Sequence, residues 1–325
     1  MATLKDVAKE AGLTTSTVSR VLNNRGYISN NTRKKVGEAI KKLNYHPNEA
    51  ARSLRMKSTN TIGLIVPHVS HPYFAEMISN MEAFAYENGY KILLCNSQCT
   101  HEKEEEYIRM CLSYKVAGII LCSGSAALEV FDGIDIPVIT MERFLDNGTA
   151  SVECDNRQGG VFAAEKLIAC GCRHLLHVGR IGTLSMPADM RTEGFKDVCD
   201  KKKVPFIELI TEDTLYCNME YSELLESTLS AHPEIDGVFA NSDVIAAQTL
   251  QVCRKLNISV PEKVKIIGFD DVNIATLTTP QLTTIHQPVK EMSKMAVNML
   301  HDAVAGKLLV RRTVLPVNLI ERETT

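Results

Sequence analysis

Hydrogen-bonding side chains without negative charge gather on one face of a short segment near the N-terminus. The stretch Leu4 to Asn24 reads LKDVAKEAGLTTSTVSRVLNN. In its second half Val18, Val21 and Leu22 recur at helical spacing, so they form the buried stripe of a predicted helix. The residues left facing outward are Thr15, Ser16, Ser19, Arg20 and Asn23. Side chains of these types donate hydrogen bonds to phosphates, and several of them both donate to and accept from base edges.

The elements that position this face are two short helices joined at a glycine. We expect Gly12 to end the first helix with positive φ. The run from Thr14 to Thr17 supplies N-cap chemistry for the second helix. This pattern describes a helix-turn-helix, whose second helix enters the major groove. It also describes a small helical hairpin that serves only for packing. A third helix is predicted within residues 30–45, where Val36, Ala39, Ile40 and Leu43 would complete the core.

Charge separates the two ends of the chain. Residues 1–60 carry twelve Lys and Arg against four Asp and Glu, a balance of +8. The remaining residues carry 24 against 35, a balance of −11, within an overall charge of −3. A basic N-terminal segment followed by an acidic remainder indicates that the N-terminal segment binds a polyanion. Nucleic acid is the expected polyanion.

Length and composition bound the remaining possibilities. A chain of 325 residues with 45% hydrophobic content predicts a globular protein of more than one domain. No apolar run is long enough for a membrane span, and the N-terminus lacks the apolar region of a signal peptide. Ten cysteines without framework-like spacing indicate reduced thiols. We therefore expect a cytoplasmic protein without membrane contact.

From Thr61 onward, short apolar runs alternate with amphipathic segments, which predicts an open α/β sheet covered by helices on both faces. The total length suits two such subdomains with a crevice at the carboxyl ends of the strands. The expected strands are 61–66, 90–95, 117–122, 137–140, 174–178, 206–210, 237–240 and 263–269. The expected helices lie near 73–88, 102–115, 125–131, 156–170, 188–202, 219–231 and 243–256.

An enzymatic function is the weaker hypothesis. The sequence holds no glycine-rich dinucleotide fingerprint, P-loop, nucleophile elbow or HExxH motif. Ser123-Gly124-Ser125 could cradle a phosphate, but such a sequence is more often a simple turn. Cys170, Cys172, His174 and His177 resemble a metal site by composition. On a strand the two histidines would face opposite sides, so we expect no metal there and no cofactor.

Ordered short motifs make the chain closely similar to the lac repressor/galactose repressor family of bacterial transcription regulators. The similarity extends over essentially the whole chain. It implies a helix-turn-helix domain over residues 1–46, a hinge helix and linker over 47–60, and an effector-binding and dimerisation core over 61–325. In that core, two interleaved α/β subdomains have the periplasmic-binding-protein fold. The motifs are DVAKEAG, TVSRVLN, TRKKV, LNYHPN, AARSL, HPYFAEM, MRTEGF, VPEKVKIIGFDD and PQLTTIHQP.

The resemblance assigns DNA contacts to the N-terminal residues. Thr15, Ser16 and Arg20 occupy base-reading positions, and Arg20 could pair with guanine. The segment 48–56 matches the hinge helix, in which Leu54 would wedge into the minor groove. The further expected contacts are the phosphate-positioning Thr14, Asn23, Ser29 and Thr32, the groove contact Tyr27, and Asn48 and Ala51 of the hinge.

The resemblance also assigns an effector site in the crevice. Tyr73 and Phe74 match aromatics that stack on a sugar ring. Arg191 and Asp270 match residues that clamp polar groups, and the alternative for this pair is an ordinary salt bridge between subdomains. The other matching positions are Glu142, Arg143, Ser185, Ser242 and Gln287. Glu142 stands where Asp is common and Ser242 where Asn is frequent, so the identity of the ligand stays open.

Taken together, these features predict a homodimeric repressor of a carbohydrate-utilisation operon. It would bind a near-palindromic double-stranded operator and respond to a small sugar, either a mono- or disaccharide or a sugar phosphate. The dimer is expected because the chain ends at ERETT, without a heptad tail for tetramers. The alternatives are a carbon regulator of the same family controlled by a phosphorylated protein, and an enzyme or transport binding protein of the same fold.

Overall fold

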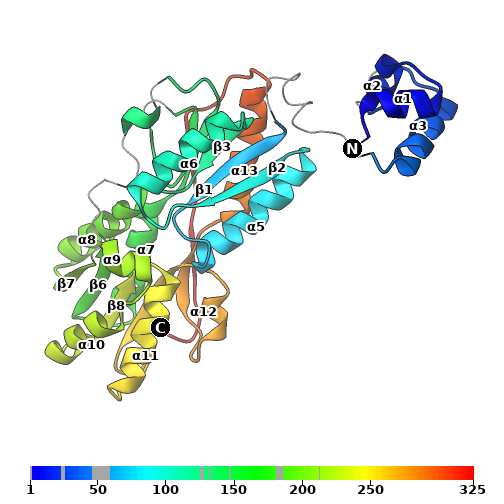
Figure 1. The fold of residues 1–325 in the computed structure, drawn as a ribbon. Coiled ribbons are helices and arrows are strands. Elements are labelled where there is room, and N and C mark those ends of the chain that lie inside the picture. The colour runs from blue at the N-terminus through cyan, green and yellow to red at the C-terminus, as the bar shows by residue number, and fades with distance from the viewer. Residues whose placement is uncertain are drawn as a thin grey trace. The chain divides into compact units, whose positions relative to one another are not determined.

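The structure, a computed structural model, divides the chain into two compact units, Met1–Thr59 and Asn60–Thr325. Figure 1 shows the helices and strands of each unit. The described residues are 2–22, 26–45, 59–124, 128–131, 133–145, 148–180, 186–211 and 213–325. Within them, no helix combines the length and the apolar character needed to cross a bilayer.

The N-terminal unit contains α1 (Leu4–Ala11), α2 (Thr15–Leu22) and α3 (Asn30–Lys42). Thr3 and Asp6 form a capping box at the start of α1, because each side chain accepts from the other's backbone N–H. Gly12 ends this helix at φ 65°, as the sequence predicted. The three helices enclose one small core, whose buried members are Val7, Ala8, Val18, Val36 and Ala39.

The second unit contains two lobes, each built on a six-stranded sheet. The N-lobe sheet has the order β11-β5-β4-β3-β1-β2 and is parallel throughout. The C-lobe sheet has the order β12-β10-β9-β8-β6-β7, with β12 antiparallel to β10. The N-lobe strands are β1 (Thr61–Val66), β2 (Lys91–Asn96), β3 (Gly118–Leu121), β4 (Val138–Met141), β5 (Ala150–Cys154) and β11 (Arg312–Leu315). The C-lobe strands are β6 (Leu175–Arg180), β7 (Phe206–Thr211), β8 (Gly237–Ala240), β9 (Lys265–Asp270), β10 (Thr283–His286) and β12 (Asn318–Ile320).

Helices cover the sheets because successive strand residues point to opposite faces. Along β1, Leu64 joins the cluster that holds Met77 of α5, whereas Ile65 joins the cluster that holds Ile108 of α6. The N-lobe helices are α5 (Pro72–Glu87), α6 (His101–Ser113) and α13 (Val289–Val304), with a 3₁₀ turn at Leu128–Phe131. The C-lobe helices are α7 (Asn156–Ala169), α8 (Met190–Lys202), α9 (Asp213–Asn218), α10 (Ser222–Ala231), α11 (Asp243–Lys255) and α12 (Ile274–Leu277), with a 3₁₀ turn at Pro187–Asp189.

Helices α7 and α8 pack backbone to backbone through two glycines. A Cβ on Gly160 would lie 1.9 Å from the carbonyl oxygen of Arg191, and a Cβ on Gly194 would lie 2.0 Å from that of Arg157. Any larger residue at either position would therefore push the helices apart. This close contact fixes the start of α8, which carries the Arg191 side chain.

The predicted fold class is confirmed, although several elements differ from the expectation. The helix predicted near 125–131 is described only as the 3₁₀ turn at Leu128–Phe131, and the helix predicted at 219–231 begins at Ser222. The short strands β5, β10, β11 and β12 and the helices α9, α12 and α13 were not anticipated. Three of these strands have only three or four residues, too few for a clear alternating pattern.

Candidate nucleic-acid interface and ligand cavity

The outer face of α2 carries the predicted base-reading residues. Thr15, Ser16 and Arg20 are exposed, while Val18 on the opposite side is fully buried. The Arg20 guanidinium lies beside Gly26, where a Cβ would come within 2.7 Å of Nη2. The face is therefore available to a partner, and its polar groups contribute little to the packing of the unit.

Two of the predicted phosphate-positioning groups lie at helix N-termini. The Thr14 hydroxyl accepts from the backbone N–H of Thr17 at 3.2 Å, and the Ser29 hydroxyl accepts from that of Thr32 at 3.2 Å. The positive end of a helix, with its exposed N–H groups, favours an anion such as a phosphate. The two N-termini thus suit the role that the resemblance assigns to them.

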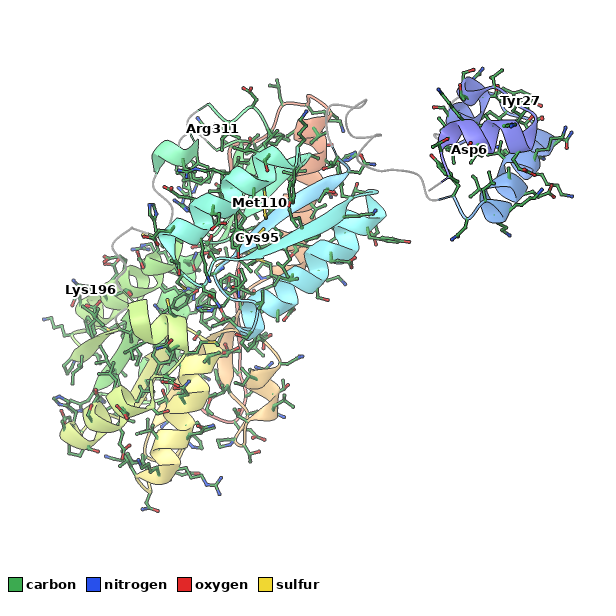
Figure 2. The ribbon with its side chains drawn as sticks, viewed as in Figure 1. Asp6, Tyr27, Cys95, Met110, Lys196 and Arg311 are labelled. Carbon is green, nitrogen blue, oxygen red and sulfur yellow. The ribbon has the colours of Figure 1, made fainter. Side chains whose placement is uncertain are left out.

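Tyr27 projects fully into solvent from the turn between α2 and α3 (Figure 2). Its exposed fraction is 95%. Because an aromatic ring this exposed stabilises nothing within the unit, a binding role is favoured over a packing role. The other predicted DNA contacts, Asn23, Asn48, Ala51 and Leu54, lie outside the described residues.

In the second unit, a cavity of about 130 Å³ opens where the carboxyl ends of the strands of both lobes meet. Pockets in open α/β sheets form at this edge, next to the point where the strand order reverses. Seven predicted effector residues line it: Tyr73, Phe74, Glu142, Arg191, Ser242, Asp270 and Gln287. The other lining residues are His71, Met77, Cys122, Met141, Met186, Ala188, Asp189, Thr211, Tyr216, Tyr221, Asn241 and Ile245.

The N-terminus of α5 supplies the aromatic part of the wall. The Tyr73 and Phe74 rings meet edge to face, 5.2 Å between centroids. His71 caps the helix by accepting at Nδ1 from the backbone N–H of Tyr73, 3.3 Å away. Burial lowers the pKa of His71 to about 4. The ring is therefore neutral at pH 7, and with Nδ1 accepting, Nε2 carries the proton and can donate.

Arg191 is the centre of the polar wall. Its Nε donates to Asn156 Oδ1 at 2.8 Å, and its Nη1 donates to the Asn241 carbonyl at 2.7 Å. The guanidinium stacks on Phe269, 3.6 Å from the ring centroid, and lies 4.0 Å from Asp270 Oδ1. These contacts hold a buried cation in one orientation, with its plane fixed by the aromatic ring.

Asp270 faces the cavity in an unusual environment. Burial raises the pKa of its carboxyl group to about 7, although the nearby Arg191 opposes the shift. Gln287 donates from Nε2 to Asp270 Oδ1 at 2.6 Å. The residue also adopts φ 112°, a backbone conformation that non-glycine residues rarely accept. The strain and the raised pKa make this position a candidate for ligand binding.

Glu142 follows β4 and lies in the N-lobe part of the cavity wall. Its two carboxylate oxygens accept from the Cys154 backbone N–H and from Asn156 Nδ2, each at 2.7 Å. Burial raises the pKa of this carboxyl group. Because Asn156 contacts both Glu142 and Arg191, one hydrogen-bonded network connects the two lobes across the cavity.

Three cavity-lining residues carry polar atoms that are not yet satisfied. Tyr73 Oη, Asn241 Oδ1 and Gln287 Oε1 are buried and have no hydrogen-bond partner within the described residues. Buried polar atoms are otherwise paired almost everywhere in folded proteins, since leaving one unpaired is costly. A ligand rich in hydroxyl groups would satisfy them.

The structure corrects the prediction for Arg143, which is absent from the cavity lining. Its Nη1 donates to Glu104 Oε1 at 3.0 Å and to the Ser123 carbonyl at 2.9 Å. Both charged side chains are buried, so the pair belongs to the interior of the N-lobe. If the Arg143 side chain turned toward a ligand, the buried Glu104 carboxylate would lose the positive charge that compensates it.

The predicted effector residues also include two serines, Ser242 and Ser185. Ser242 lines the cavity, but its hydroxyl also caps α11 by accepting from the Ile245 backbone N–H at 3.3 Å. Ser185 lies outside the described residues. Sequence reasoning missed Asn156 and Asn241, although each follows the carboxyl end of a strand. It also missed Tyr216, for which the short helix α9 gives no sequence signal.

The cysteine and histidine group near β6 does not converge. His174 is exposed, whereas His177 is buried, stacked on Phe195 and Phe239 at 5.2 and 4.9 Å between centroids. Its Nε2 lies 2.8 Å from the Thr192 hydroxyl. His177 is thus a core residue of β6, whereas His174 precedes the strand and is exposed.

Comparison with known proteins follows the same division of the chain. The family model described as bacterial regulatory proteins, lacI family, matches residues 3–48, and the periplasmic binding protein-like domain matches residues 164–325. The chain is 34% identical to the ribose operon repressor of Halalkalibacterium halodurans, over 100% of this chain and 97% of that protein. The chain belongs to the LacI family.

Other LacI family members show comparable similarity. The sucrose operon repressor of Streptococcus mutans is 35% identical, over 100% of this chain and 99% of that protein. A periplasmic binding protein/LacI transcriptional regulator from Alkaliphilus metalliredigens, solved in complex with D-xylulofuranose, is 31% identical. It aligns with a TM-score of 0.74 over 82% of this chain and 99% of its own. The two curated relatives are named as repressors of different sugar operons, ribose and sucrose, so their names leave the ligand of this chain open.

Proposed function

We propose that this protein is a DNA-binding repressor of a carbohydrate-utilisation operon, and that a neutral monosaccharide in the cavity between the lobes controls its affinity for the operator. The observation that carries the proposal is the cavity at the lobe boundary. Its wall combines the edge-to-face rings of Tyr73 and Phe74, the Arg191–Asp270 pair and three buried polar atoms without hydrogen-bond partners among the described residues. Aromatic rings match the apolar face of a sugar, and unpaired polar atoms match its hydroxyl groups.

Cavity size favours a monosaccharide. A volume of about 130 Å³ is small beside the roughly 300–1,000 Å³ of typical ligand pockets, which favours a ligand with a single sugar ring. A disaccharide has about twice as many non-hydrogen atoms as a monosaccharide and suits this volume less well. The relatives include repressors named for ribose and for sucrose, and the Alkaliphilus regulator was solved with a five-carbon sugar.

Cavity charge favours a neutral ligand over a sugar phosphate. Among the described lining residues, Arg191 is the single cation, and it already contacts Asn156, Asn241 and Asp270. Glu142, Asp189 and Asp270 contribute carboxyl groups to the same wall. A phosphate placed here would meet more acidic groups than basic ones.

Control of DNA binding requires that the ligand prefer one arrangement of the lobes. A ligand that contacts both Glu142 of the N-lobe and Asp270 of the C-lobe has that preference. Moving the population of lobe arrangements from about 1:99 to 99:1 requires that the ligand prefer one arrangement by about 10⁴-fold. In a dimer, each of the two cavities could supply about 100-fold of this preference. We propose release of the operator on sugar binding, by two subunits that each read half of a near-palindromic site.

Two measurements test the proposal. A thermal-shift screen of pentoses, hexoses, disaccharides and sugar phosphates should give the largest rise in melting temperature with one neutral monosaccharide. A gel-shift titration with the upstream region of the chain's own gene should then show release of DNA by that sugar. Stabilisation only by sugar phosphates or by a phosphorylated carrier protein would reject the neutral ligand, and failure to bind duplex DNA at low salt would reject the repressor.

A further inference from the structure

Three side chains that commonly bind metals gather beside Tyr216, a residue that lines the cavity. The ligand atoms of His68, Cys99 and Cys217 all lie within 4.8 Å of one another. His68 Nε2 and Cys99 Sγ are 3.2 Å apart. His68 is buried, while both cysteines are partly exposed, so an ion could reach the cluster from solvent.

The three residues come from both lobes. His68 follows β1 and Cys99 follows β2, and these two strands are neighbours in the N-lobe sheet. Cys217 lies on α9, which follows β7 of the C-lobe. The preceding residue, Tyr216, lines the cavity and meets the His68 ring edge-on at 5.7 Å between centroids. The cluster therefore spans the boundary between the lobes beside the ligand cavity.

The donor set matches a specific class of ion. One imidazole nitrogen and two thiolate sulfurs suit a soft or borderline metal, and Zn²⁺ with two cysteines, one histidine and a water is an established combination. With Zn–S near 2.3 Å and Zn–N near 2.0 Å, tetrahedral ligand atoms lie roughly 3.5–3.8 Å apart. Atoms within 4.8 Å of one another reach this geometry through small side-chain movements.

We propose that His68, Cys99 and Cys217 form a Zn²⁺ site that links the N-lobe to the C-lobe. The fourth ligand is a water molecule, because both cysteines are partly exposed. Binding converts each thiol to a thiolate and releases its proton to solvent. The ion holds the lobes at the spacing that brings Cys217 to His68, so it is coupled to any cavity ligand that prefers the same spacing.

Metal titration of the full-length chain tests the site. The reduced protein, kept in a phosphine reductant, is titrated with Zn²⁺ against a chromophoric chelator, and with Co²⁺ for its absorption spectrum. We expect one Zn²⁺ per chain and a thiolate-to-cobalt charge-transfer band with tetrahedral d–d bands. Cys99→Ser, Cys217→Ser and His68→Ala should each weaken Zn²⁺ binding by more than about tenfold, since even loss of an outer-shell partner costs 10–100-fold.

Cys170→Ser is the matched control, because Cys170 is also partly exposed but lies at the end of α7, outside the cluster. It should bind Zn²⁺ as the unchanged protein does. Circular dichroism of each variant without metal shows that the fold is intact. Absence of the charge-transfer band in the unchanged protein overturns the proposal. Unaltered affinity in Cys217→Ser also overturns it, because the ion would then bind without connecting the lobes.

Discussion

The N-terminal unit and the two-lobed unit present their functional side chains in opposite ways. On α2, Thr15, Ser16 and Arg20 point into solvent, and the packing is done by other residues such as Val18. In the cavity, Arg191 and Asp270 are almost fully buried, and each is hydrogen-bonded to another residue of the C-lobe. Recognition and stability are therefore separable in the first unit and linked in the second.

This difference follows from the two ligands. A duplex presents its groove edges to a protruding surface, so the reading side chains need no enclosure. A small sugar must be surrounded before its hydroxyl groups can be distinguished, which places charged side chains in a poorly solvated environment. Substitutions on the exposed face of α2 should therefore change DNA binding with little change in stability, whereas substitutions of buried cavity residues should change both.

The largest effect is expected at the buried pair that lies away from the cavity. Arg143→Met leaves Glu104 buried without its cation and should lower the free energy of unfolding by about 3–5 kcal/mol. Urea unfolding followed by circular dichroism measures it. The double variant Glu104→Gln/Arg143→Met should recover part of the loss. The thermal shift caused by the effector should stay unchanged, and its loss in a folded Arg143→Met protein would place Arg143 in the site after all.

Asp270 should link stability to pH. Its folded-state pKa, about 7, lies above the value of 3.8 for the free group, so between these values the folded chain holds a proton that the unfolded chain releases. Asp270 therefore lowers the free energy of unfolding as pH rises from about 4 to 7, by at most about 1.4 kcal/mol per pH unit. Asp270→Asn should gain stability relative to the unchanged protein over that range, in urea titrations at pH 5, 6 and 7.

The same variant should lose its response to the effector while retaining operator binding. If the difference in free energy of unfolding between Asp270→Asn and the unchanged protein does not change with pH, the pH dependence comes from another carboxyl group. Asp243 is the nearest alternative, because burial also raises its pKa and Asp270 interacts with it.

Arg20→Ala should weaken specific operator binding by about 1–3 kcal/mol and relax discrimination at one base pair. The free energy of unfolding should change by less than about 0.5 kcal/mol, because Arg20 is exposed. Competition gel shifts with single-base operator variants measure the preference. Lys34→Ala, an exposed cation on α3, is the control and should weaken binding to all sequences alike. An unaltered base preference in Arg20→Ala would remove Arg20 from the reading face.

The smallest change in stability is expected for Tyr27→Ala, within about 0.5 kcal/mol, because the ring is 95% exposed. Operator affinity should nevertheless fall, since the family resemblance assigns the ring a groove contact. Fluorescence anisotropy with labelled operator measures this loss. A variant that is less stable but binds DNA normally would contradict the separation of binding and packing in this unit.

Much of the architecture could be predicted from the sequence because its signals are local. The apolar stripe, Gly12 and the Thr14 cap lie within a few residues of one another, and they predicted α1 and α2 as the structure has them. The longer strands, such as β1, were equally clear. The very short strands β11 and β12 were missed because pairing with distant strands, rather than their own pattern, makes them strands.

The sequence by itself determined most of the longer helices and strands, which end of the chain carries positive charge, and the family to which the chain belongs. Only the tertiary structure decided which polar side chains share a site. Asn156, Arg191 and Asp270 are far apart in the chain and meet because both sheets direct their carboxyl ends to one crevice. Arg143 was assigned to that crevice by the family resemblance, but it is paired with the buried carboxylate of Glu104 and is not among the lining residues. Local periodicity cannot predict such choices, because they depend on contacts between residues that only the fold brings together.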